Sequence, residues 1–104
     1  MVIVFLADGF EEAEGLVPVD VLKRCGLDVK TVSIMDTKTV TGRSGITVLA
    51  DEHYKEFEAE DFSAVILPGG LPGADHLQNS AYVKDAVKKA QNDEKFKKVL
   101  IDFI

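Results

Sequence analysis

The chain has 104 residues, of which 46% are hydrophobic, and its net charge is −6 at neutral pH. This length suits one small domain, which we expect to cover residues 1–104, and the apolar runs are too short to span a membrane. The acidic balance argues against a nucleic-acid partner, because neutralising phosphates needs a basic surface. No signal peptide is recognised, and the single cysteine favours a reducing, cytoplasmic setting.

A buried strand is predicted over residues 2–6, since this run is apolar and rich in β-branched side chains. After a turn at Asp8-Gly9, a helix is predicted to run to about residue 25. Because of Pro18, this helix either begins near Gly15 or starts earlier and is kinked by the proline. Its apolar stripe is expected to face the core and to make the cysteine a packing residue: Leu16, Val17, Val21, Leu22 and Cys25.

Alternating side chains over residues 28–35 predict a second strand. Turn signals at 41–42 and 44–45, followed by an apolar run at 46–49, predict a hairpin-like excursion within residues 40–50. Residues 51–63 are acidic and are expected to be irregular, with one helical turn around 54–57.

The second half repeats the alternation of strand and helix. Residues 64–67 predict a strand, 71–77 a loop with a short turn, and Ser80 caps a helix that ends near Asp93. Residues 99–104 predict a final strand that contains Asp102. This order predicts an α/β fold with a mostly parallel sheet, incomplete at the C-terminus because a central strand needs cover on both faces.

Glu11, Glu12 and Glu14 open the first helix. In one interpretation they are solvated acids that favour the positive end of the helix dipole. In the other, one of them points inward, where a carboxyl group against a packed sheet hydrogen-bonds or carries a proton. Helical spacing puts positions 11 and 14 on one face and 12 elsewhere. The acids also disfavour a phosphate or dinucleotide at this helix start.

The glycine pair Gly69-Gly70 follows a strand, at the edge where open α/β sheets bind ligands. It is either a plain turn or a source of backbone N–H groups for a developing oxyanion. Arg43 lies on a loop and is either solvated or able to bind an anion. His53 and His76 lack ligand spacing, so neither a metal nor another cofactor is expected.

Three ordered motifs carry a resemblance to a known family. They read ADGFEEAE at 7–14 with PVDVL at 18–22, then VTG at 40–42 with GITV at 45–48, then LPGGLPGA at 67–74. With these motifs the chain resembles the first half of the ThiJ/PfpI superfamily, in the branch of the parkinsonism-associated deglycase. The match covers nearly the whole chain.

The resemblance implies a flavodoxin-like three-layer sandwich, related to class I glutamine amidotransferases, and a homodimer with a cysteine nucleophile at a strand-to-helix elbow. By position, Glu14 matches the glutamate that hydrogen-bonds the cysteine sulfur. Gly69 and Gly70 match the glycines whose backbone amides face that sulfur. Arg43 or Ser44 falls in the region of a loop arginine, which makes Arg43 a candidate substrate contact.

The nucleophile is expected directly after Ile104, where the sequence stops, so Cys25 does not match it. A fragment, a modified next residue and a truncated gene are all compatible with this ending. The family implies a glyoxalase or deglycase that acts on small reactive carbonyls or glycated groups. The alternatives are a stress chaperone or redox sensor, a PfpI-type peptidase or amidase, and an inactive remnant.

Overall fold

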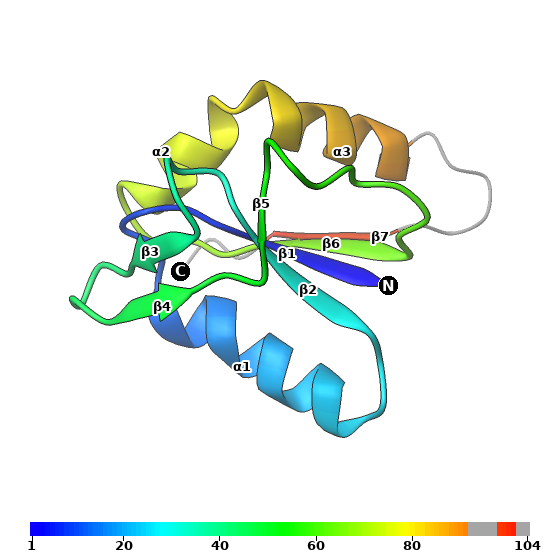
Figure 1. Ribbon diagram of the computed structural model, residues 1–104, viewed down its shortest axis with the longest axis horizontal. Helices are drawn as coiled ribbons and strands as arrows, with labels where there is room; N and C mark the ends of the chain where they lie inside the picture. The colour runs from blue at the N-terminus through cyan, green and yellow to red at the C-terminus, as the bar shows by residue number, and fades with distance from the viewer. Residues whose placement is uncertain (92–97, 102–104) are drawn as a thin grey trace.

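The computed structural model describes residues 1–91 and 98–101. Within these residues, five strands form one parallel sheet in the order β5-β2-β1-β6-β7, and β3 and β4 form a separate antiparallel hairpin (Figure 1). This confirms the predicted mostly parallel α/β architecture and the excursion at residues 40–50. The strands are β1 (Val2–Leu6), β2 (Val29–Ser33), β3 (Thr39–Thr41), β4 (Thr47–Leu49), β5 (Glu52–His53), β6 (Ala64–Leu67) and β7 (Lys98–Ile101).

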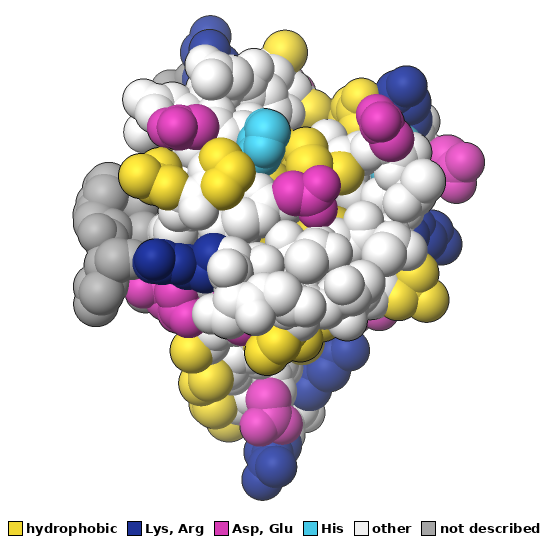
Figure 2. Space-filling model, turned by 90° about the vertical axis from the view of Figure 1, so that its left-hand side faces the viewer, with side chains coloured by type: hydrophobic (Ala, Val, Ile, Leu, Met, Phe, Trp, Pro, Cys, Tyr) yellow, Lys and Arg dark blue, Asp and Glu magenta, His cyan; other side chains and the backbone are white. Residues whose placement is uncertain are grey.

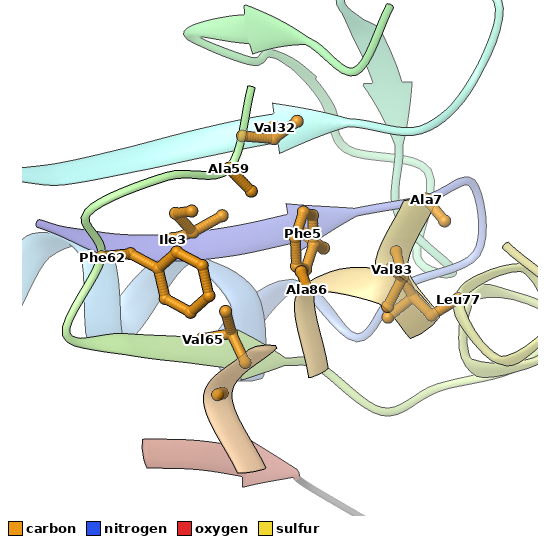
Figure 3. Packing of buried hydrophobic residues seen from close by; sticks show 11 residues of the cluster. Ile3, Phe5, Ala7, Val32, Ala59, Phe62, Val65, Leu77, Val83 and Ala86 are labelled. Carbon is orange, nitrogen blue, oxygen red and sulfur yellow. The ribbon is translucent and has the colours of Figure 1, made fainter. Parts of the chain in front are cut away.

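Helices cover both faces of the sheet: α1 (Glu12–Arg24) on one face, α2 (Gly73–Gln78) and α3 (Ala81–Gln91) on the other (Figure 1). Since successive side chains of a strand point to opposite faces, β1 supplies both cores. Val4 packs on the α1 side, whereas Ile3 and Phe5 pack on the α3 side. Figure 3 shows the α3-side cluster, in which Phe5 and Val65 lie among side chains from several elements.

Helix α1 begins earlier than one of the predicted alternatives. The Glu11 carboxylate accepts hydrogen bonds from the backbone N–H groups of Ala13 (3.3 Å) and Glu14 (3.1 Å), and so caps the helix from the preceding residue. The helix therefore starts at Glu12 and continues through Pro18, and a start near Gly15 is wrong.

The predicted apolar stripe of α1 is only partly correct. Leu16 and Leu22 pack against the core, together with Val19. Val17 and Val21 are 55% and 48% exposed, and the cysteine is exposed as well, so it is not the packing residue that we expected. The reason is that only a narrow strip of the α1 surface contacts the sheet. The spacing of apolar residues predicts the position of this strip only approximately.

Two short elements differ from the prediction. Residues 73–78 form α2 instead of a loop; its N-cap, Pro72, has no side-chain hydrogen bond, so the usual sequence signal of a helix start is missing. Residues 52–53 form β5, which was not predicted. The Ser80 cap is confirmed, since its Oγ accepts from the N–H of Val83 at 3.2 Å.

Two of the sequence predictions fall outside the described residues: the end of the last helix near Asp93 and the end of the last strand with Asp102. Over the described part of the chain, no helix combines the length and apolar character that crossing a membrane requires.

Candidate functional site

The candidate site lies at the carboxyl edge of the sheet, where β1 and β6 end side by side. The two strands are parallel neighbours, with Val4 level with Ile66. The segments that leave them, residues 7–11 and 68–73, therefore meet at the same edge. Figure 2 looks onto this edge, where acidic, basic and hydrophobic side chains are interspersed and no single sign of charge dominates.

Glu14 and Gly69 are in direct contact at this edge. The backbone N–H of Gly69 donates to Glu14 Oε1 at 2.9 Å, across 55 residues of sequence. A second hydrogen bond runs beside it, from the N–H of Glu11 to the carbonyl of Gly69 at 2.8 Å. The Glu14 side chain is half-buried, and its hydrogen bond to Gly69 shows that it is turned toward the sheet edge.

The glycine loop packs so tightly on residues 9–11 that it leaves no room for side chains. A Cβ atom on Gly70 would lie 2.6 Å from the backbone nitrogen of Glu11, and its φ of +92° favours glycine as well. A Cβ on Gly73 would lie 2.6 Å from the nitrogen of Phe10. Among the described residues, the N–H of Gly70 has no hydrogen-bond partner. It is therefore an amide that can serve a ligand.

Glu12 is buried on the other side of the helix start. Its Oε2 accepts from the backbone N–H groups of Ser44 (2.9 Å) and Ile46 (3.2 Å), in the turn between β3 and β4. Burial acts to raise the pKa of Glu12, but the hydrogen bonds outweigh it, and the net effect is a pKa below the ordinary value. The sequence analysis named Glu12 as one of three candidate acids but did not predict its partner, because nothing near it in the chain shows which loop it would meet.

The structure places the other candidates as follows. Arg43 is exposed, and its backbone is held by a hydrogen bond of 2.9 Å from its N–H to the carbonyl of Phe10. His53 is buried, with Nε2 2.6 Å from the carbonyl of Met35. Over residues 1–91 and 98–101, no group of His, Cys, Asp or Glu side chains is arranged to hold a metal ion.

A cavity of about 450 Å³ lies near the glycine loop, between α2, α3 and the end of β6. Its lining is mostly apolar, and Leu67 and Pro68 contribute to it just before the glycine pair. Neither Glu14 nor Gly70 is among the described residues that line it. The cavity and the glutamate–glycine contact are therefore separate features.

Comparison with known proteins identifies the family of the chain. A sequence model of the DJ-1/PfpI family matches residues 1–98. The chain belongs to the DJ-1/PfpI family. This agrees with the resemblance that the three motifs carry.

Individual relatives support the same assignment. The chain is 36% identical over 92 residues to protein DJ-1 homolog B of Arabidopsis thaliana, covering 88% of this chain and 21% of the relative. It is 38% identical over 69 residues to a deglycase of Thermococcus kodakarensis, covering 66% of this chain and 41% of the relative. The chain thus spans less than half the length of these curated DJ-1/PfpI relatives.

A solved structure shows the same fold. The oxidized DJ-1 of Toxoplasma gondii superimposes with a TM-score of 0.87 at 33% identity, covering 96% of this chain and 53% of that one. The fold is therefore the flavodoxin-like α/β fold of the DJ-1 proteins, and the described residues correspond to about half of such a domain.

Proposed function

We propose that the complete protein is a cysteine-dependent enzyme that acts on small reactive carbonyls, as a glyoxalase or deglycase. Family membership and the similarity to a deglycase of Thermococcus kodakarensis support the proposal. The observation that carries it is the contact between Glu14 Oε1 and the N–H of Gly69 at the carboxyl edge of the sheet. This is where an open α/β sheet binds ligands.

The proposed chemistry assigns a separate task to each group. With Oε1 accepting from Gly69, a protonated Glu14 carries its proton on Oε2 and donates it to a cysteine thiolate, which lowers the pKa of that cysteine. β7 runs parallel to β6, with Ile101 level with Leu67, so a cysteine after this strand in the complete protein would enter at the same edge.

The amide roles differ from the sequence expectation, which gave both glycines the same task. Because the N–H of Gly69 is bonded to Glu14, we assign it to orienting the carboxyl group. The N–H of Gly70 is the one we assign to the developing oxyanion. Arg43 stays a proposed substrate contact, since its backbone is anchored while its side chain is exposed.

The test replaces Glu14 in the complete protein. Glu14→Gln and Glu14→Ala should raise the cysteine pKa, because a donor to the thiolate is removed or weakened. They should also slow methylglyoxal consumption by about a hundredfold. Thiolate absorbance against pH gives the cysteine pKa, and turnover assays give the rate. Glu11→Gln is the matched control, since Glu11 caps the same helix. An unchanged cysteine pKa in both Glu14 variants would contradict the proposal.

A second candidate function is a redox sensor, favoured by the oxidized state in which the Toxoplasma gondii DJ-1 was solved. In that case Glu14 holds an oxidised cysteine by a hydrogen bond. Rapid mass gain with peroxide, combined with negligible methylglyoxal turnover, would select this function over the enzymatic one.

We also propose that the protein forms a homodimer through the outer face of α1. Ala13, Val17 and Val21 follow one another at intervals of four and are exposed, which makes an apolar stripe on the helix. Two copies that pack antiparallel about a two-fold axis would bury this stripe on both helices.

A further inference from the structure

Two carboxylates from the first turn of α1 bind loops on different sides of the helix. Glu14 reaches the loop after β6 through Gly69, and Glu12 reaches the turn between β3 and β4 through Ser44 and Ile46. Positions two apart on a helix differ by about 200° in direction. The first turn is thus held between two loops that come from distant parts of the chain.

The Glu12 carboxylate is tightly packed against the turn at residues 42–46. The residue is only 7% exposed. A Cβ atom on Gly42 would lie 2.3 Å from Glu12 Cδ, so even an alanine at position 42 would displace the carboxylate. The lowered pKa of Glu12, in which its hydrogen bonds outweigh burial, keeps the carboxylate charged near neutral pH, where it accepts both N–H groups.

The same turn is also joined to the segment before the helix. The N–H of Gly9 donates to the carbonyl of Thr41 at 2.9 Å, and the N–H of Thr41 donates to Asp8 Oδ1 at 3.0 Å. The N–H of Arg43 donates to the carbonyl of Phe10 at 2.9 Å. The hairpin therefore packs along residues 8–12, which the glycine loop also contacts.

We propose that Glu12 is a positioning residue for Glu14: by holding the turn at residues 42–46, it fixes the orientation of the first turn of α1 that places Glu14 Oε1 on the N–H of Gly69. Glu12 itself touches no reacting atom. This proposal rests on the proposed function for its consequence, since the placement of Glu14 matters to a cysteine only if Glu14 acts on one.

The experiment measures hydrogen exchange of the Gly69 amide in the complete protein, because this amide reports where Glu14 is. Glu12→Ala should accelerate that exchange by about tenfold or more, since the bond to Glu14 opens more often. Gly42→Ala should accelerate this exchange too, because its Cβ atom displaces the Glu12 carboxylate while the glutamate itself is kept. Glu12→Gln keeps an acceptor oxygen and should have a much smaller effect.

Asp51→Ala is the matched control. Asp51 likewise accepts hydrogen bonds from another segment, through the N–H (2.9 Å) and the hydroxyl (3.0 Å) of Thr31, but in a part of the sheet away from the glycine loop. When Asp51→Ala and Glu12→Ala lower the free energy of unfolding by the same amount, Asp51→Ala should leave hydrogen exchange of the Gly69 amide unchanged. A merely structural role for Glu12 predicts the same response from both variants.

The cysteine pKa is the second readout, and it should rise in Glu12→Ala and in Gly42→Ala. Wild-type exchange at Gly69 in both variants, with the amides of Ser44 and Ile46 released, would overturn the positioning role. If Glu12→Ala does not fold, Glu12→Asp can replace it, since it keeps the charge on a shorter side chain. Wild-type exchange of the Gly69 amide in Glu12→Asp would also overturn the positioning role. If Glu14→Gln leaves the cysteine pKa unchanged, the proposed function fails, while exchange at Gly69 still decides the role of Glu12.

Discussion

Gly15 illustrates, at the scale of one residue, how packing reverses an intrinsic preference. Within a helix, alanine is normally more favourable than glycine by about 1 kcal/mol. A Cβ atom at this position, however, would lie 2.8 Å from ring carbons of Phe10 and 3.2 Å from Leu6 Cδ2, and both residues are buried. The glycine lets α1 lie close to the segment that carries the site.

We therefore predict that Gly15→Ala lowers the free energy of unfolding by about 1–3 kcal/mol, the usual cost of overpacking a core. Urea denaturation of the purified protein measures it. Ala13→Gly, at an exposed position of the same helix, should cost only about 1 kcal/mol through propensity. A more stable Gly15→Ala variant would show that Phe10 yields freely and that the close packing is unimportant.

The three glutamates mark how far residue-level prediction reached. Spacing placed Glu11 and Glu14 on one helix face, but Glu11 is the extended N-cap and meets Gly69 through its backbone N–H, whereas Glu14 meets it through the carboxylate. It could not reveal that Glu11 caps the helix or that Glu12 binds the turn at 44–46. The partners of Glu12 are remote in sequence, so only the folded chain brings them within hydrogen-bonding distance.

At the scale of elements, Asp51 ties the segment after β4 to β2. Burial acts to raise its pKa, but hydrogen bonds from the backbone and hydroxyl of Thr31, helped by Lys23 and Lys30, lower the pKa below its ordinary value. The folded state thus binds this proton more weakly than the unfolded state. The stability it contributes is present above the ordinary pKa of 3.8 and is lost as the pH falls through the lower, folded value.

Asp51→Asn should accordingly lower the free energy of unfolding near neutral pH, and the gap from the wild type should narrow once the pH falls below about 3.8. Denaturant titrations at several pH values give both quantities. A gap that stays constant with pH would mean that the carboxylate is not held by Thr31.

Among the elements, those with strong local signals were predicted well and the short ones were not. The apolar runs of β1 and β6 and the Ser80 cap of α3 were clear from the sequence. The short helix α2 has no side-chain cap, and β5 is formed only by pairing with β2 at Val32 and Ser33. Such elements owe their existence to tertiary contacts more than to propensity.

For the whole molecule, the proposed dimer gives a further prediction. Val17→Asp and Val21→Asp should convert a dimer to a monomer, because each places a charge in an apolar interface. Sedimentation or light scattering gives the mass. Ala81→Asp, an exposed position on α3 on the opposite face of the sheet, should leave the dimer intact. A wild-type protein that stays monomeric at high concentration would contradict the proposed dimer interface.

By itself, the sequence determined the α/β architecture, because buried parallel strands require continuous apolar runs and the helices between them require their own periodicity. It also determined the family, through three motifs in order. Only the tertiary structure decided that Gly69 gives its N–H to Glu14 and that Glu12 turns away toward the hairpin. The physical reason is range: propensity and spacing act within a few residues, whereas a hydrogen bond across 55 residues depends on where the sheet brings two loops together.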